Sequence, residues 1–234
     1  MLAALPLACG AQTEGEDDAV PAPKDWHGRV QVRRENVDRG TSEETTRTYL
    51  RSDNFVRGGM LSFQVAFPDE GSGFNPRLGD SKTRYRFAAF PAGRYEISYF
   101  LEATFPTADP SELGTGKYQL SAGMTTVTEG RFRYTAQLQQ INSVAGDDRR
   151  TNINWTKLDL SLRDIHEGHW LKAAVNTRVD WEQGGKTGAV GEIEYGQRFS
   201  EQWSVWLLGG TLLWGEGVKG TYGTKLMIGV DRWF

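Results

Sequence analysis

The sequence lacks any long hydrophobic run, since no stretch approaches the ~20 consecutive apolar residues that a membrane-spanning helix needs. Cysteine is nearly absent, with Cys9 as the single example, so a disulfide framework is excluded. The net charge is only -3 at pH 7, and a balance this close to neutral does not predict nucleic acid as a partner. What remains is a chain in which charged and apolar residues are mixed throughout.

Motifs of the common enzyme chemistries are missing as well. There is no Walker loop, no G-x-S-x-G and no dinucleotide fingerprint. The sequence has three histidines, His27, His166 and His169, and none has a serine two residues away. This argues against a lipid-modifying enzyme. The H-x-x-H of residues 166–169 offers two metal ligands on one turn without a nearby third. We therefore expect no catalytic residue, no cofactor and no metal.

The N-terminus predicts export. Residues 1–11 resemble the end of a secretory signal peptide, because an apolar stretch is followed by small residues. Lipidation of Cys9 stays open, although Pro6 stands where a lipobox prefers leucine. Residues 12–25 are acidic and lack periodicity, which is typical of a flexible leader. The folded domain is then expected over residues 26–234.

Apolar and polar residues alternate with a period of two along that domain. In residues 169–181 one face carries Leu171 and Val175, and the other carries Lys172 and Arg178. The same alternation occurs in residues 82–90, 93–105 and 131–139. Because successive side chains of a strand point to opposite faces, these segments are half-buried strands. With no helical period elsewhere, the sequence predicts an all-β protein.

The connections between these strands alternate in length. Short turns are expected at 91–94, 128–131, 166–169 and 200–202, and longer loops at 68–79, 106–116, 144–150, 183–187 and 215–221. In an up-and-down outer-membrane barrel, short turns face the periplasm and long loops face outside. If residues 27–35 and 45–52 form a further hairpin, an antiparallel transmembrane barrel of about twelve strands results. Ten strands with an N-terminal plug is the alternative.

The placement of aromatic residues separates a membrane barrel from a soluble sandwich or lipocalin. On the apolar face, aromatic residues cluster at two heights with small or aliphatic residues between them, as two interfacial girdles require. Near the short turns they are Tyr95, Phe132, Phe199, Trp203 and Phe234, and near the long loops Phe67, Phe105, Tyr118, Trp181 and Tyr222. This sorting favours a monomeric barrel in the outer membrane of a Gram-negative bacterium, in contact with lipid and lipopolysaccharide.

The polar face of a membrane barrel points into the lumen, where bases outnumber acids. We predict that the pore is lined by Lys82, Arg84, Arg86, Arg94, Glu96, Arg131, Arg133, Lys172, Arg178, Glu192 and Glu194. An electropositive lumen concentrates anions, which predicts a channel for small anionic or aromatic-acid solutes. The alternative is a structural barrel whose lumen is closed by salt bridges.

The chain ends on Phe234, preceded by alternating apolar residues. This ending resembles the C-terminal signal by which outer-membrane barrels reach the barrel-assembly machinery. Arg232 departs from that pattern, which usually has an apolar residue there. An arginine at the membrane interface is nevertheless tolerated, because its long stem lets the charge reach water.

Residues 105–123, FPTADPSELGTGKYQLSAG, carry a further resemblance. The stretch is similar to the P-T-G-D…L-G-x-G-x-(aromatic)-x-L signature of outer-membrane transporters of the phenol-degradation MetA-pathway type, with Ala108 in place of a glycine. The resemblance implies an outer-membrane transporter of aromatic compounds. Its glycines allow either a tight loop folded into the barrel mouth or a plain turn. For the first case we predict a constriction formed by Thr107, Asp109, Gly114 and Gly116.

Overall fold

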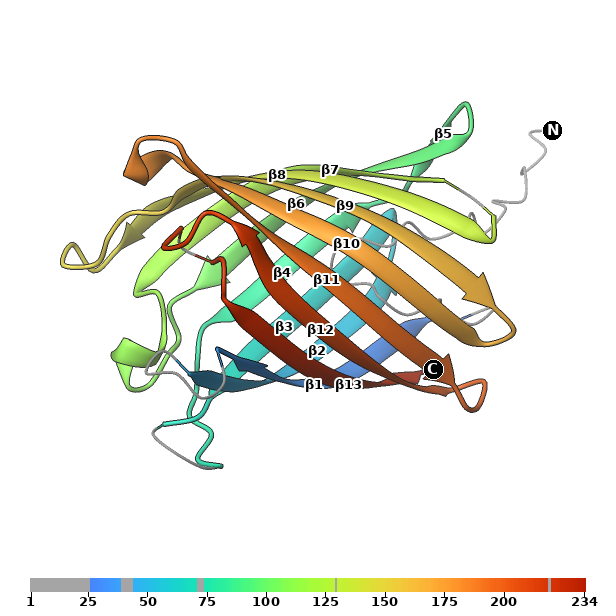
Figure 1. The fold of residues 1–234 in the computed structure, drawn as a ribbon, viewed down its shortest axis with the longest axis horizontal. Coiled ribbons are helices and arrows are strands. Elements are labelled where there is room, and N and C mark those ends of the chain that lie inside the picture. The colour runs from blue at the N-terminus through green and yellow to red at the C-terminus, as the bar shows by residue number, and fades with distance from the viewer. Residues whose placement is uncertain (1–25, 39–43, 71–73, 129, 219) are drawn as a thin grey trace.

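The computed structural model describes residues 26–234, apart from 39–43, 71–73, 129 and 219, and its strands curve into one closed sheet (Figure 1). The expected signal-peptide end at 1–11, the acidic leader at 12–25 and Cys9 lie outside these described residues. No helix in the described part is long and apolar enough to cross a membrane.

Nearly every element is a β-strand, as the two-residue period predicted. The strands are β1 Gly28–Val37, β2 Thr45–Val56, β3 Gly59–Pro68, β4 Ser81–Phe87, β5 Phe90–Ala92, β6 Tyr95–Phe105, β7 Lys117–Thr128, β8 Phe132–Gly146, β9 Asn154–His166, β10 His169–Asp180, β11 Lys186–Arg198, β12 Trp203–Trp214 and β13 Thr224–Trp233. Two short 3₁₀ turns, η1 Ser111–Leu113 and η2 Trp181–Gln183, lie in connections.

Strands that follow one another in sequence pair antiparallel, apart from β4 and β5, and β1 pairs with β13 to close the sheet. Both β4 and β5 pair with β6, so they are two parts of one barrel strand interrupted at residues 88–89. The result is a closed antiparallel barrel of 12 strands. The predicted fold class and strand number are confirmed, including the hairpin of β1 and β2.

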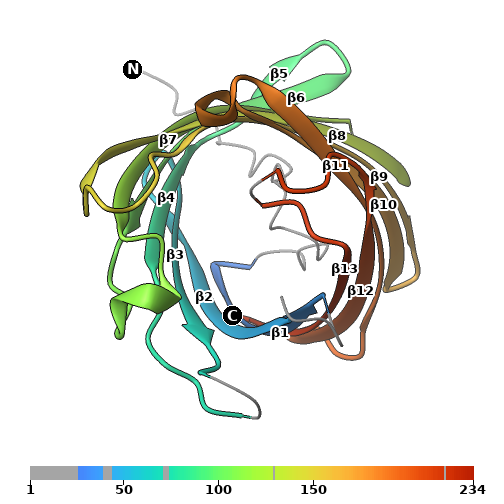
Figure 2. The ribbon, with the colours of Figure 1, turned by 60° about the vertical axis from the view of Figure 1, so that its left-hand side comes forward.

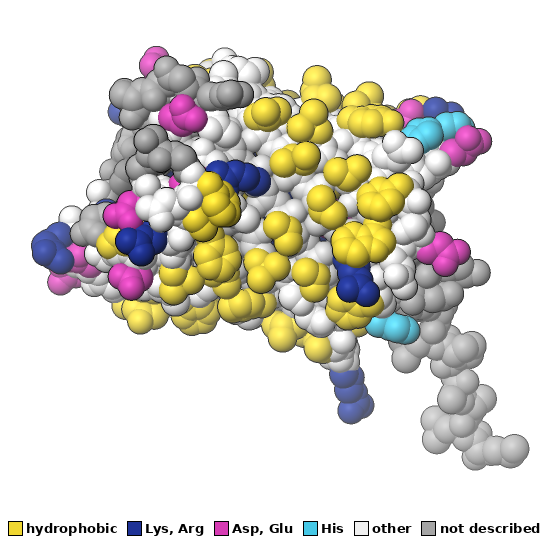
Figure 3. All heavy atoms as spheres, turned by 90° about the horizontal axis from the view of Figure 1, so that it is seen from below, with side chains coloured by type: hydrophobic (Ala, Val, Ile, Leu, Met, Phe, Trp, Pro, Cys, Tyr) yellow, Lys and Arg dark blue, Asp and Glu magenta, His cyan; other side chains and the backbone are white. Residues whose placement is uncertain are grey.

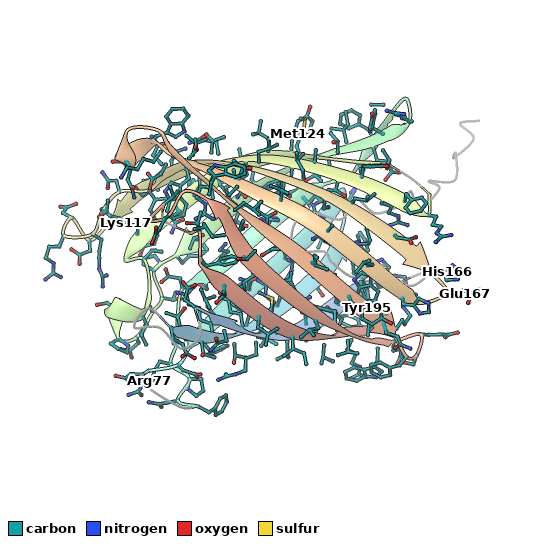
Figure 4. The ribbon with its side chains drawn as sticks, viewed as in Figure 1. Arg77, Lys117, Met124, His166, Glu167 and Tyr195 are labelled. Atoms are coloured by element: carbon teal, nitrogen blue, oxygen red, sulfur yellow. The ribbon has the colours of Figure 1, made fainter. Side chains whose placement is uncertain are left out.

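The two ends of the barrel differ. We call the end with the short turns the turn end; it holds the connections at 57–58, 93–94, 129–131, 167–168 and 199–202 and also both Trp26 and Phe234. His166 and Glu167 mark this end in Figure 4, and the opposite end is called the loop end. The loop end holds the connections at 38–44, 69–80, 106–116, 147–153, 181–185 and 215–223. The sequence predicted this alternation of short and long connections.

The outer wall of the barrel is apolar. Leu101 and Ile193 face outward with 54% and 63% of their surface exposed, whereas Arg84 and Lys172 point inward and are only 5% and 7% exposed. Figure 3 shows hydrophobic side chains over the middle of one outer face, with most charged side chains near the two ends. Water disfavours so large a continuous apolar surface, and a lipid bilayer requires it.

Aromatic side chains border this apolar surface at both ends, with one exception. Tyr95, Phe132, Phe199, Trp203 and Phe234 are exposed at the turn end, and Phe105, Tyr118 and Trp181 at the loop end. The prediction is wrong for Tyr222, whose hydroxyl donates to Glu192 Oε1 at 2.5 Å inside the barrel. The reason is that β13 begins only at Thr224, so the outward alternation does not extend to residue 222.

Inside the barrel, large aromatic rings lie flat against the wall over glycines of the neighbouring strand. The cross-strand pairs are Trp170 with Gly196, Trp206 with Gly229 and Phe100 with Gly123. A Cβ added at Gly196 would lie 1.9 Å from the Trp170 ring, and one at Gly229 would lie 2.2 Å from the Trp206 ring. Glycine is therefore needed at these positions so that the rings occupy the wall rather than the lumen.

We expect Gly196→Val to destabilise the barrel by about 1–3 kcal/mol, because the added side chain overlaps the Trp170 ring. The measurement is urea-induced unfolding of the protein refolded into lipid vesicles. Gly209→Val is the matched control, because an added Cβ there meets nothing within 4 Å. Equal losses in the two variants would contradict this packing.

Candidate functional site

Most of the predicted pore-lining residues lie on the inward side of the wall. They are Lys82, Arg84 and Arg86 of β4, Glu96 of β6, Arg133 of β8, Lys172 and Arg178 of β10, and Glu192 and Glu194 of β11. On the β4 side Arg84 Nη2 pairs with Glu102 at 2.7 Å, and its guanidinium carbon lies 4.5 Å from the centre of the Phe100 ring. Lys82 Nζ lies 3.7 Å from the same carboxylate.

Two of the predicted residues lie outside the lumen. Arg94 is exposed in the turn before β6, where its Nη2 donates to the Tyr95 hydroxyl at 2.7 Å. Arg131 precedes β8 and pairs through Nε with Asp164 at 2.7 Å, with 57% of its side chain exposed. The prediction is wrong for both, because a turn residue is not held by the strand alternation and its side chain can fold onto the outer face.

The segment at 106–116 is also placed differently from the predicted constriction. Thr107 Oγ1 donates to the Gly79 carbonyl at 2.8 Å, and the Asp109 amide donates to the Leu78 carbonyl at 2.8 Å. Gly116 accepts from the amide of Asp147 at 2.9 Å. The segment therefore packs between two neighbouring loop-end connections, and Figure 2 shows η1 outside the ring of strands.

Its glycines serve this packing rather than a constriction. A Cβ at Gly114 would lie 2.2 Å from Asp80 Oδ1, so glycine lets the segment approach the β3–β4 connection closely. Asp80 in turn accepts from the amide and the hydroxyl of Thr115, both at 2.7 Å. The predicted constriction by Thr107, Asp109, Gly114 and Gly116 is therefore wrong.

The connection that enters the lumen is the one between β12 and β13, residues 215–223, called here the inner loop (Figure 2). Val218 is buried at 3% exposure, and Thr221 Oγ1 donates to its carbonyl at 2.7 Å. A Cβ at Gly220 would lie 1.3 Å from Arg178 Nη1, so the loop backbone rests directly on that guanidinium. Sequence analysis expected a loop here but gave no signal for its inward direction.

A cavity of about 180 Å³ lies inside the barrel beneath the inner loop. Its cationic lining residues are Arg33, Lys157, Lys172, Arg178 and Lys225, and its acidic ones are Glu35, Glu192 and Glu194. Trp206, Leu208 and Met227 form an apolar side, and Gly220, Thr221 and Tyr222 of the inner loop border it as well. The cavity combines positive charge with a flat aromatic surface.

The carboxylates of the cavity already have donors. Glu192 receives the Tyr222 hydroxyl, Lys225 Nζ at 2.5 Å and Asn176 Nδ2 at 2.8 Å. Glu194 accepts from Trp170 Nε1 at 2.6 Å. These acids keep their negative charge, but five bases against three acids leave the cavity lining with a net positive charge.

Lys172 differs from the other bases of the cavity. Only 7% of its surface is exposed. It borders the cavity from β10, where its partners on the neighbouring strands are Arg163 of β9 and Glu194 of β11. Within the described part of the chain its ammonium forms neither a hydrogen bond nor a salt bridge. The charge of Glu192 acts on this ammonium without direct contact. An ammonium removed from bulk water and without a direct ion pair favours an anion beside it.

Below the cavity, a cluster of tryptophans occupies the turn end of the lumen. Trp170, Trp206 and Trp233 form it with Leu208 and Met227, and Trp26 packs against them. Asp231 links the cluster to β1 by hydrogen bonds, because its carboxylate accepts from Trp206 Nε1 at 2.9 Å and from Gln31 Nε2 at 2.7 Å. Sequence analysis missed this cluster.

An ion-pair network continues from this cluster along β1 and β2. Arg29, which is 1% exposed, forms a close pair with Asp53, and Arg51 Nε donates to the other oxygen of Asp53 at 2.7 Å. Arg29 Nη1 also lies 3.6 Å from Asp231. In the described residues, no three histidine, cysteine or acidic side chains lie close enough to hold a metal ion.

The barrel is similar in structure to several solved channels. An outer-membrane channel from Pseudomonas putida F1 matches with a TM-score of 0.70 at 14% identity, over 95% of this chain and 100% of that one. The NanC porin matches at 0.66 and 9% identity, over 87% and 98%, and the KdgM porin at 0.63 and 8%, over 88% and 99%.

At such low identities the likeness concerns the fold alone. No protein-family model matches the chain, and no curated protein matches it. The resemblance of residues 105–123 to the phenol-degradation group therefore stays a prediction. The chain has the fold of outer-membrane channels.

Proposed function

We propose that this chain is an outer-membrane channel of a Gram-negative bacterium that passes small anionic solutes through its lumen. The observation that carries the proposal is the Lys172 ammonium, which borders the inner cavity and forms no hydrogen bond or salt bridge within the described residues. A solute carboxylate at this point supplies the missing counter-charge. The solute remains bound only briefly if other basic residues of the lumen offer it further binding positions on its way out.

The shape and chemistry of the cavity favour an anion attached to a ring. Trp206 and Tyr222 supply aromatic surface on which a planar or cyclic solute can stack, while Lys172 and Arg178 supply positive charge. An aromatic acid fits this combination, and the resemblance of residues 105–123 supports the same class. A KdgM structure is described as a complex with disordered oligogalacturonate, so one barrel of similar fold takes an acidic saccharide.

A second candidate function is a structural barrel that does not conduct. The inner loop and the tryptophan cluster both occupy the lumen, one above the cavity and one below it. If neither moves, the ion pairs of the lumen serve only to fill the interior. We favour the channel, because a sealed interior gives no reason for an ammonium at Lys172 without a direct ion pair in the described residues.

The expected partners follow from the outer wall. Outer-membrane lipid and lipopolysaccharide contact the apolar surface, and the exposed ring of Phe234 ends the closing strand beside Gly28. We propose that the barrel-assembly machinery recognises this terminal aromatic residue. Nucleic acid is not part of the proposal.

Lys172→Glu should lower the preference of the channel for chloride over potassium. Replacing an ammonium by a carboxylate at the cavity wall changes the local electrostatic free energy by about 1 kcal/mol or more, which corresponds to roughly fivefold in the permeability ratio. The measurement is the reversal potential of the protein in a planar bilayer under a potassium chloride gradient.

The matched control is Lys186→Glu, which makes the same change of charge at an exposed position at the loop-end start of β11. We expect this control to keep the wild-type reversal potential. An equal shift in both variants assigns the effect to overall charge and contradicts a site at Lys172. No current from any folded sample supports the structural barrel instead.

Shortening the inner loop, by replacing residues 217–221 with two glycines, should raise single-channel conductance because it removes chain from the lumen. The matched control removes residues 111–113, the η1 turn that packs among the loop-end connections. We expect that deletion to leave conductance near the wild-type value. If removal of η1 raises conductance and shortening of the inner loop does not, the constriction has been misplaced.

A further inference from the structure

Three arginines at the turn end lie on the outer rim beside aromatic residues. The guanidinium carbon of Arg94 is 5.0 Å from the centre of the Tyr95 ring, and that of Arg232 is 5.5 Å from the Trp203 ring. Arg57 is exposed in the turn between β2 and β3, where its carbonyl accepts from the Tyr85 hydroxyl at 3.3 Å. We call these three residues the rim arginines.

Three arginines of the loop end, in contrast, each pair with a carboxylate. Arg34 lies 2.5 Å from Asp69, Arg77 lies 2.7 Å from Glu70 and Arg149 lies 3.0 Å from Asp147. Hydrogen bonds from Arg149 lower the pKa of Asp147 below the ordinary value of an aspartate. Figure 4 labels Arg77 at this end of the barrel.

No rim arginine has such a carboxylate. Within the described residues, Arg57, Arg94 and Arg232 form no salt bridge, whereas Arg131 at the same end pairs with Asp164. A guanidinium has five N–H donors, and Arg94 uses one of them for the Tyr95 hydroxyl. The remaining donors are available to a ligand that comes from the bilayer side.

The position of the rim arginines selects the chemistry of that ligand. They lie where the apolar outer wall meets exposed aromatic side chains, which is the level of lipid headgroups in an embedded barrel. A guanidinium is planar and directs its donors in one plane, which matches phosphate oxygens, and the rings beside Arg94 and Arg232 limit how those two side chains turn. Each arginine also brings a positive charge that no acid of the described residues pairs with, which favours a headgroup with net negative charge.

We propose that the rim arginines bind the headgroups of anionic phospholipids in the leaflet at the turn end. The inference rests on the proposed membrane location of the barrel but not on the nature of the transported solute. It distinguishes the turn end from the part of the loop end where Arg34, Arg77 and Arg149 are held by Asp69, Glu70 and Asp147.

Native mass spectrometry of the detergent-solubilised protein with equimolar phosphatidylglycerol and phosphatidylcholine tests this proposal. The wild type should retain phosphatidylglycerol preferentially. Each of Arg57→Gln, Arg94→Gln and Arg232→Gln should lower that preference by up to about fivefold, and the triple variant should nearly abolish it. The matched control is the triple variant Arg34→Gln, Arg77→Gln and Arg149→Gln, which removes the same charge at the loop end and should keep the preference.

Folding of every variant is checked by the shift of the unheated protein on a denaturing gel. If the triple rim variant does not fold, the single variants and a salt titration of the wild type decide, since added salt should weaken the preference. Equal retention of both lipids by the wild type, or full preference in folded rim variants, overturns the proposal. Neither result bears on the channel, whose failure would appear as an absence of current in bilayers.

Discussion

The constraint on which this structure depends is that lipid offers no hydrogen bonds to the backbone. A sheet exposed to lipid must therefore close on itself, and here β1 pairs with β13 along nine residue positions from Arg29↔Trp233 to Val37↔Lys225. Closure fixes two environments for alternate side chains, one on the outer surface of the barrel and one facing the lumen. Leu101 and Ile193 take the first, and Arg84 and Lys172 take the second.

A small lumen lined by charged residues must also be filled with side chains. The packing differs between the β10–β13 side and the β4–β6 side of this lumen. Along β10 to β13, indoles lie on glycines and are tied to Glu194 and Asp231, which leaves a cavity beneath the inner loop. Along β4 and β6, Arg84 lies over Phe100 and pairs with Glu102. Both sides of the lumen therefore combine aromatic surface with charged groups.

Much of the fold could be predicted from the sequence. Where apolar and charged residues alternate, as Leu171 and Lys172 do, the pattern indicates which side chains point to each face of a strand. The errors arise where alternation stops. Arg94 and Arg131 belong to turns, and Tyr222 precedes β13, so strand parity did not govern their side chains. Trp170 and Trp206 were not recognised as a cluster, because their glycine partners stand on neighbouring strands and pairing register cannot be read from one sequence.

The central claim, that outward positions meet lipid and inward positions meet water in a closed barrel, is tested most directly by spin labels along β10. Single cysteines would replace residues 171–178 in turn, in a Cys9→Ser background and in lipid vesicles. The account predicts that oxygen dissolved in lipid relaxes labels at odd positions, and that a water-soluble nickel complex relaxes labels at even positions. The reverse pattern, or no alternation, would contradict it.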